Sequence, residues 1–447
     1  MANSRKSKSN LLERVAEALS PVVPQEHSIL LGLSGGIDSV VLLHLLSTLA
    51  PRFSWRLSAL HINHGISPNA DVWAKFCEEL CSRYKVPIII ERVDIAPLRN
   101  EHGIEAAARK LRQAAFFRQA CDFVALAHHA DDQAETLLLQ LLRGAGIKGV
   151  AAMPLLKHAT ALTHATLRPL LEITRDSLLK YAQKHELNWV EDESNAVDYY
   201  PRNFLRNQIL PKLEEKFPAY RNTLSRSASH FAEASELLDE LAQQDLQNWV
   251  KGDPLDLAFL HSVSLPRSKN LLRYFLYTSG APMPQSSHLD DMLQQLMEAR
   301  KDAAVCIEFA HWQVRRFQNK IYVLPSLSDY DRNLKLTWQG ENELEWPASN
   351  KRLLLTKSTG QGISLNKLQQ APITFRLRSG KEKLRPFSNA STRSLKNLLQ
   401  EKKIPPWLRE RLPLMYCGEE LVCVVDVAIT ERYQAQNGEE GLSVTSV

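Results

Sequence analysis

The first 215 residues alternate short apolar runs with longer segments of helical spacing. The apolar runs, each of strand length, are residues 28–33, 57–62, 87–93, 122–129 and 165–171. Segments in which apolar residues recur every three or four positions follow them at 38–49, 70–84, 103–120, from about 131 and from about 174. Strands that alternate with helices predict right-handed βαβ units and a parallel sheet, which binds ligands beyond the carboxyl ends of its strands.

The pattern changes after about residue 221. Residues 223–249 predict one long amphipathic helix, residues 255–300 predict further helices, and residues 307–324 predict a hairpin. Residues 328–350 are polar and rich in turn-forming residues. We therefore expect a Rossmann-like α/β domain over 1–217, a mainly helical domain over 218–327, a linker over 328–351 and a small α+β domain over 352–447.

The composition is that of a folded soluble protein, with 44% hydrophobic and 23% charged residues. No apolar run reaches the roughly 18 residues of a membrane-spanning helix, and no export signal follows the basic first ten residues. The six cysteines are too few for a disulfide framework. Cys77 and Cys81 lie four apart in a helical pattern, which favours buried thiols over a metal or redox pair. We expect a cytoplasmic protein without a membrane partner, either a monomer or a homodimer.

The net charge of +5 is unevenly distributed. The segment from Arg376 to Arg411 holds eleven Lys and Arg residues against three Glu, so it carries a net charge of +8 and leaves −3 for the rest of the chain. A basic block on a near-neutral body is typical of a nucleic-acid-binding surface. A solvated, lysine-rich face is the alternative.

Residues 34–39, Ser-Gly-Gly-Ile-Asp-Ser, join the first apolar run to the first helical segment. Glycine lets the backbone approach a ligand, and free N–H groups at a helix start favour an anion. A carboxylate beside phosphates is explained most simply by Mg²⁺ between them. The segment matches neither the Walker nor the dinucleotide-binding pattern, and a tight turn without a ligand is the alternative. We predict that a phosphate cradle is formed by Ser34, Gly35, Gly36, Ile37, Asp38 and Ser39.

This segment resembles the pyrophosphatase loop of the N-type ATP pyrophosphatases, which cleave ATP to AMP and diphosphate. Residues 61–73, 103–116, 127–146, 168–182, 191–211 and 404–421 resemble, in the right order and at similar spacing, the tRNA(Ile)-lysidine synthetase family. The resemblance implies a carbon–nitrogen ligase that uses ATP and Mg²⁺, with Asp38 holding the metal through ATP. It implies that free L-lysine is joined to ring position 2 of the wobble cytidine in tRNA(Ile) with a CAU anticodon. The reaction would pass through adenylated tRNA and form lysidine, AMP and diphosphate.

Acidic residues begin the helix predicted near residue 131. Carboxylates there could orient a lysine ammonium, accept its proton or hold Mg²⁺. We favour Asp132 and Glu135 as catalytic residues that bind lysine, with Arg143 two turns further on the same side. Acids that complement the helix dipole, and a zinc site, are the alternatives.

Arg109 and Arg112, three apart on a predicted helix, can face one ligand. Their expected roles are substrate activation for Arg109 and ATP binding for Arg112; the alternative is an ordinary surface ion pair between Glu105 and Arg109. His61 is expected at the adenine pocket through its backbone, or in a structural role.

Contacts with tRNA are expected at two places. The first combines an aromatic ring, an amide and two guanidinium groups, which suits an exposed anticodon loop: Tyr200, Arg202, Asn203 and Arg206. A solvated polar loop is its alternative. The second lies in the basic block: Arg385, Arg393, Lys396, Trp407 and Arg409. Two rival functions stay open, a tRNA thiolase with the same loop and a tRNA-binding protein whose nucleotide site is vestigial.

Overall fold

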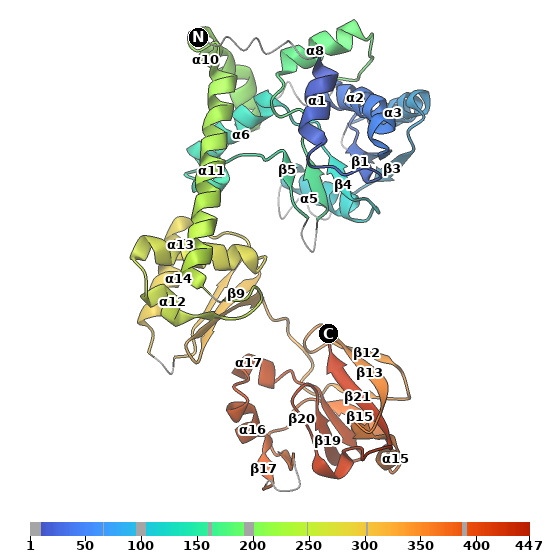
Figure 1. Ribbon diagram of the computed structural model, residues 1–447, viewed down its shortest axis with the longest axis vertical. Coiled ribbons are helices and arrows are strands. Elements are labelled where there is room, and N and C mark those ends of the chain that lie inside the picture. Colours follow the sequence, from blue (N-terminus) through green and yellow to red (C-terminus); the bar gives the residue numbers. More distant parts are fainter. Residues whose placement is uncertain are drawn as a thin grey trace. The chain divides into compact units, whose positions relative to one another are not determined.

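The computed structural model describes residues 10–65, 67–94, 104–159, 163–191, 201–247, 249–300, 303–386 and 391–447. The chain divides into two compact units, residues 1–238 and 239–447 (Figure 1). The boundary between them falls inside one continuous helix, α11 (Tyr220–Leu246). The predicted domain limits at residues 217, 327 and 351 stay predictions.

The first unit is built on a six-stranded sheet of order β3-β2-β1-β4-β6-β5. Its strands are β1 (Ser28–Gly32), β2 (Arg56–Asn63), β3 (Ile88–Arg92), β4 (Phe123–Ala125), β5 (Leu156–Lys157) and β6 (Ala165–Leu167). All neighbours pair in parallel except β5, which runs antiparallel to β6 at the edge. The predicted parallel α/β fold is therefore confirmed. The strand order reverses between β1 and β4, and ligands of open α/β sheets bind at such a switch point.

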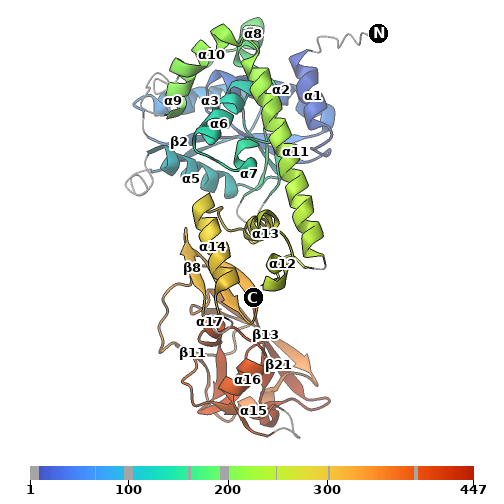
Figure 2. The same cartoon turned by 90° about the vertical axis from the view of Figure 1, so that its left-hand side faces the viewer.

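Helices cover both faces of this sheet (Figures 1 and 2). They are α1 (Leu11–Leu19), α2 (Ile37–Phe53), α3 (Ala70–Tyr84), α5 (Ile104–Phe117), α6 (Ala130–Leu142), α7 (Ile147–Val150) and α8 (Arg175–Lys184). Successive residues of β1 serve opposite faces, because Ile29 and Leu31 join one core cluster and Leu30 joins another with Phe116 of α5. Both faces are thus buried, as parallel sheets require.

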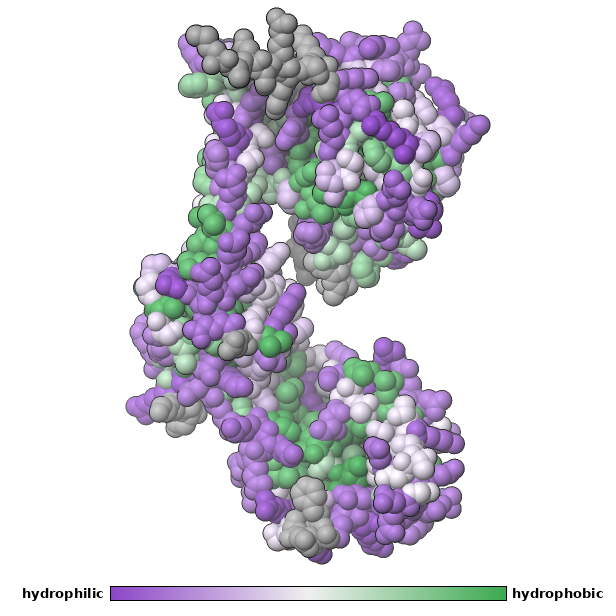
Figure 3. Space-filling model, viewed as in Figure 1, coloured by the Kyte–Doolittle hydropathy of each residue, from purple (hydrophilic) through white to green (hydrophobic). Residues whose placement is uncertain are grey.

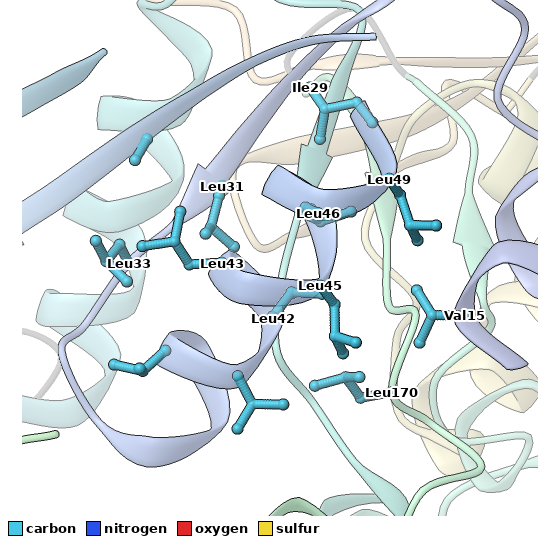
Figure 4. Packing of buried hydrophobic residues seen from close by; sticks show 14 of the residues in the cluster. Val15, Ile29, Leu31, Leu33, Leu42, Leu43, Leu45, Leu46, Leu49 and Leu170 are labelled. Carbon is cyan, nitrogen blue, oxygen red and sulfur yellow. The ribbon is translucent and has the colours of Figure 1, made fainter. Parts of the chain in front are cut away.

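The helix after the phosphate loop, α2, is fixed in the core by its own apolar side chains. Leu42, Leu43, Leu45 and Leu46 of α2 are almost completely buried. A helix that is apolar around most of its circumference has to lie inside a core. Figure 4 shows these side chains meeting β1 and Leu170. Each buried leucine contributes about 1.5–3 kcal/mol, so the loop is fixed to a rigid element.

A helical stretch follows the sheet. It consists of α9 (Pro201–Phe204), a π-helical turn (Leu205–Ile209) and α10 (Leu210–Lys216), before α11 begins. π-Helical turns are rare and often mark functional positions. Arg206 lies in this turn, which matters for the site described below.

The second unit begins with helices and an antiparallel sheet. Its helices are α12 (Leu257–His261), α13 (Leu265–Thr278) and α14 (Ser286–Glu298). The sheet, of order β7-β10-β9-β8, contains β7 (Leu255–Asp256), β8 (Cys306–Phe309), β9 (Trp312–Phe317) and β10 (Lys320–Pro325). The predicted hairpin is thus part of a larger antiparallel sheet, and its apolar side packs with Leu271 and Phe275 of α13.

The C-terminal part is built mainly from two antiparallel sheets around one core. Its strands are β11 (Lys335–Thr337), β12 (Glu343–Trp346), β13 (Lys351–Thr359), β14 (Ile363–Ser364), β15 (Ile373–Arg376), β16 (Lys383–Leu384), β17 (Arg393–Ser394), β18 (Leu414–Cys417), β19 (Glu420–Val424), β20 (Ala428–Ile429) and β21 (Glu440–Ser446). Its helices are α15 (Leu365–Leu368), α16 (Leu395–Glu401), α17 (Pro406–Arg409) and a 3₁₀ turn (Glu431–Tyr433). The segment 328–351, expected as a linker, contributes β11 and β12, and Trp346 is fully buried in the core.

Hydrophilic residues predominate on the face drawn in Figure 3, and apolar residues surface in separate groups. Within the described ranges, no helix is both long enough and apolar enough to cross a membrane.

Candidate active site

The loop between β1 and α2 has a backbone that requires glycine. Gly35 has φ of +88°, and a Cβ atom there would lie 2.9 Å from Val190 Cγ2. Ser34 Oγ accepts the Gly36 N–H at 3.3 Å and lies 3.1 Å from Ser39 Oγ. Among described residues, no side-chain hydrogen bond caps the start of α2. Its first N–H groups therefore remain available to an anion, as the loop pattern predicts.

Asp38 lies in the first turn of α2 and has one unsatisfied oxygen. Its Oδ1 atom is buried and has no hydrogen-bond partner within the described part of the chain. Its Oδ2 atom lies 3.5 Å from Nε2 of His129. A buried carboxylate oxygen without a partner is costly, and Mg²⁺ prefers such oxygen ligands together with phosphates. The residues present therefore fit the expected Mg²⁺.

His129, at the start of α6, lies among three carboxylates. Its Nε2 atom is 3.5 Å from Asp38 and from Asp132, and its Nδ1 atom is 3.6 Å from Asp131. Burial alone would lower the pKa of His129, but the carboxylates outweigh burial and raise it to about 10. The ring is thus an imidazolium at neutral pH, and it holds the phosphate loop against the acidic start of α6. No sequence argument singled out this residue.

Asp132 and Glu135, the predicted lysine ligands, are buried and bonded to two arginines. Arg202 Nε lies 2.7 Å from Glu135 Oε2, and Arg206 Nε lies 2.6 Å from Glu135 Oε1. The Nη2 atoms of Arg202 and Arg206 lie 2.9 Å and 3.2 Å from Asp132 Oδ1. These bonds raise the pKa of Arg206 although burial acts to lower it. Residues that the sequence placed in a lysine site and in a tRNA site therefore form one cluster.

Positively charged side chains influence His128, the residue before His129. Arg168 follows β6 and donates from Nη1 to the Pro154 carbonyl at 2.9 Å, while its buried Nε has no partner among the described residues. Burial and the positive charge of Arg109 lower the pKa of Arg168 to about 10. Burial is also the main cause that lowers the pKa of His128 to about 4, so this ring is neutral. Arg168 is a site residue that sequence reasoning missed, although it opens a segment quoted for the family resemblance.

The remaining predicted residues of the first unit lie at varied distances from this centre. His61 is buried, and its Nδ1 atom is 2.9 Å from the Leu33 carbonyl, so the ring links β2 to the loop. Arg112 is exposed on α5. The pKa of His64 is lowered to about 4, mainly by the burial of His64 and secondly by the positive charge of Arg112. Arg143 caps the opposite end of α6, about 12 Å along the helix from Glu135. Asn203 lies in α9, whereas Tyr200 lies outside the described residues.

The predicted tRNA residues of the basic block are accessible or engaged in weak pairs. Arg385 lies 3.2 Å from Glu431, Arg393 lies 2.7 Å from Glu401, and Lys396 is exposed on α16.

Trp407 packs against the β9–β10 hairpin, and its predicted contact with tRNA stays a prediction. Its ring meets those of Tyr322 and Phe317 edge-on, with centroids 5.4 Å and 6.1 Å away. Arg315 lies 5.1 Å above the Trp407 ring, and Arg409 donates to the Ile404 carbonyl at 2.6 Å. These contacts give Trp407 and Arg409 packing roles within the second unit.

All six cysteines are free. Burial raises the pKa of Cys77 to about 12 and that of Cys81 to about 11. Thiols with such pKa values are not nucleophiles near neutral pH, in agreement with the expected buried pair. No group of three or more His, Cys, Asp or Glu in the described part of the chain could hold a metal ion, which disfavours the zinc alternative.

Three family models match this chain. Residues 6–213 match a PP-loop domain, residues 255–322 match the TilS substrate binding domain, and residues 373–446 match the TilS substrate C-terminal domain. The tRNA(Ile)-lysidine synthase of Nitrosomonas europaea is 42% identical over 92% of this chain and 90% of its own length. That of Coxiella burnetii is 41% identical over 92% and 91%, respectively. Among solved structures, the U34-tRNA thiolase NcsA of Methanococcus maripaludis covers 50% of this chain and 78% of its own, at 22% identity and a TM-score of 0.43. At these identities and coverages, the chain belongs to the tRNA(Ile)-lysidine synthase family.

Proposed function

We propose that this chain uses ATP to join L-lysine to ring position 2 of the wobble cytidine in tRNA(Ile) with a CAU anticodon. AMP and diphosphate are released, and lysidine is formed. The observation that carries the proposal is that His129 joins the phosphate loop to a buried pair of carboxylates at one edge of the sheet. A site that activates an oxygen with ATP and then admits an amine needs both parts close together.

The phosphate loop binds the triphosphate of ATP. The N–H groups at the start of α2 and the hydroxyls of Ser34 and Ser39 face the anion, and Asp38 offers its unsatisfied oxygen to Mg²⁺. When bound, the metal neutralises charge on the phosphates and so favours departure of diphosphate. His129 keeps Asp38 oriented without competing for Oδ1, because it approaches the other oxygen.

Arg109 and Arg168 supply positive charge to the site. The charge of Arg109 lowers the pKa of Arg168, so the two guanidinium groups repel one another and both are better stabilised when an anion lies near them. Adenylation of the cytidine develops negative charge on the α-phosphoryl oxygens. Fixed guanidinium groups are suited to stabilise that charge. Neutral His128 sits beside them and adds no further positive charge.

Asp132 and Glu135 bind the lysine ammonium. In the absence of RNA, both carboxylates are hydrogen-bonded to Arg202 and Arg206. Glu135 has no exposed surface, so an ammonium cannot reach it while both arginines are bonded. Phosphates of the anticodon loop offer the guanidinium groups other partners of equal charge. Release of the arginines frees the two carboxylates for lysine. The amine is therefore positioned only when the RNA, with its cytidine, is already bound.

The basic block contributes affinity for the tRNA. Arg385 and Arg393 are held by half-exposed acids, and surface pairs of this kind are worth only about 0–1 kcal/mol. They can therefore be exchanged for phosphate contacts at little cost. Lys396 lies exposed beside them.

The decisive experiment incubates the full chain with ATP, Mg²⁺, labelled lysine and unmodified tRNA(Ile), followed by nucleoside analysis. Labelled lysidine, with AMP and diphosphate in equal amounts, is the expected result. Ornithine should react about 10²-fold more slowly, because its amine is misplaced by roughly 1 Å, and norleucine should neither react nor compete. Diphosphate release without lysine in the RNA would contradict the proposal, as would the appearance of a thiolated nucleoside.

A further inference from the structure

Asp131, in the first turn of α6, contacts groups from two other helices, α8 and α11. Its Oδ2 atom accepts the backbone N–H of Arg175 at 2.9 Å, at the start of α8. The same oxygen lies 3.6 Å from His129 Nδ1, and Oδ1 accepts Nε of Arg221. These contacts lower the pKa of Asp131 although burial acts to raise it, so the carboxylate stays charged and engaged.

Arg221 is the second residue of α11, the helix that leaves the first unit. Its Nη1 and Nη2 atoms lie 2.5 Å and 3.0 Å from the two oxygens of Glu214 in α10. The adjacent Tyr220 is buried against Ala134 of α6. Further along α11, Ala228 packs against Leu137 of α6. Figure 2 shows α6 and α11 side by side. One face of α6 therefore rests on α11, while its first turn carries Asp131 and Asp132.

We propose that Arg221 is a positioning residue of the active site, which acts through Asp131 and His129 on Asp38 and Asp132. The inference rests on the proposed roles of those two carboxylates. Arg221 fixes Asp131, Asp131 orients the ring of His129, and that ring lies between the metal carboxylate and the lysine carboxylate, at 3.5 Å from each. Arg221 itself is assigned no contact with a substrate.

The contact between Arg221 and Asp131 is largely buried, so its loss should be costly. The side chains of Arg221 and Asp131 are 23% and 13% exposed, and removal of one partner leaves a largely buried charge without compensation. Asp131 and Asp132 are neighbours in one helical turn, so a shift of the first moves the second. Because α11 continues to Leu246 in the core of the second unit, Arg221 ties the start of that helix to the reacting groups.

The test compares Arg221→Gln, Arg221→Lys and Asp131→Asn in the full chain. Diphosphate release and lysine transfer are followed separately, with kcat, KM for ATP and lysine, tRNA affinity and the thermal midpoint. We expect kcat of Arg221→Gln to fall between about tenfold and about 10²-fold, as for reacting groups misplaced by up to roughly 1 Å. KM for ATP and the affinity for tRNA should stay within about twofold, and Arg221→Lys should recover part of the loss because it keeps the charge.

Two further comparisons sharpen the test. The double variant Arg221→Gln/Asp131→Asn should be no slower than the slower single variant, since both substitutions break the contact between Arg221 and Asp131. The matched control Glu214→Gln removes only the exposed partner of Arg221 and should keep kcat within about threefold.

Three results would overturn the inference. They are an unchanged kcat with a lowered thermal midpoint, a weakened tRNA affinity with an unchanged kcat, and losses that add in the double variant. If Arg221→Gln does not fold, Arg221→Lys decides. Failure of the unaltered chain to transfer lysine contradicts the proposed function instead, and diphosphate release still reports on Arg221.

Discussion

Arg206 Nε lies 2.6 Å from Glu135 Oε1, and Glu135 has no exposed surface. A second guanidinium, that of Arg202, holds the other oxygen of the same carboxylate at 2.7 Å. A buried carboxylate bonded on both sides to arginines is not open to a further cation. In the proposed reaction, lysine therefore has to bind after the RNA has displaced these two arginines.

Lysine should bind weakly to the chain alone and more tightly once RNA and an ATP analogue that cannot be cleaved are present. The expected gain is at least about tenfold, because the ammonium otherwise competes with two charge-assisted bonds of about 1.5–3 kcal/mol each. Equilibrium dialysis with labelled lysine, with and without an anticodon stem–loop, measures it. Norleucine serves as the control, and equal lysine affinity in both conditions would refute the gating of this site.

Asp38→Ala should abolish AMP formation while leaving the fold and tRNA binding nearly intact. The substitution removes the oxygen that fits Mg²⁺ and no core volume. Losing one electrostatic contact at a transferring phosphoryl group costs about 10²–10³ in rate. Asp176→Ala is a matched control, because Asp176 is also a first-turn acid but is exposed and paired only on the surface, with Lys180. Diphosphate release within about threefold of the unaltered chain would exclude the metal role.

The triple substitution Arg385→Gln, Arg393→Gln and Lys396→Gln should weaken tRNA binding and flatten its salt dependence. Each lost phosphate contact reduces the slope of log K against log salt by roughly 0.7–0.9. Filter binding at several salt concentrations gives the slope. The control is Arg352→Gln on β13, which breaks a comparable surface pair with Glu343 on β12. An unchanged slope would show that this part of the basic block is only a solvated face.

The stability of the first unit should fall as the pH drops from about 6.5 towards 4. Burial, Arg112 and His61 lower the pKa of His64 from 6.5 to about 4 in the folded chain, and burial lowers that of His128 to about the same value. The unfolded chain therefore binds more protons in this window, and stability rises with pH across it. His129, whose pKa is raised to about 10 in the folded chain, acts with the opposite sign, and its contribution falls mainly above pH 6.5.

Urea denaturation at several pH values measures this dependence. His64→Gln should reduce the slope of the acid limb between pH 4 and 6.5, with the part due to His128 retained, and leave the slope above pH 7 unchanged. An acid limb of the same slope in the variant would assign the effect to other groups.

Local patterns predicted some elements well and others poorly. The five apolar runs mark β1, β2, β3, β4 and β6, because buried parallel strands are nearly continuous in apolar residues. Edge strands carry little such signal, so β5, two residues long, was not predicted. Residues 328–351 are polar for the same reason, although Trp346 enters the core and donates its indole N–H to the Arg411 carbonyl at 2.8 Å.

The sequence by itself determined the phosphate loop, the parallel sheet and the apolar helix that anchors the loop. Each of these depends on residues that are neighbours along the chain, where spacing and glycine positions record the structure. Only the tertiary structure decided which charges meet. Arg202 and Glu135 are separated by 67 residues, and Arg221 and Asp131 by 90. Pairs between side chains of different helices follow from how those helices pack, and no periodicity along one chain encodes that partner choice.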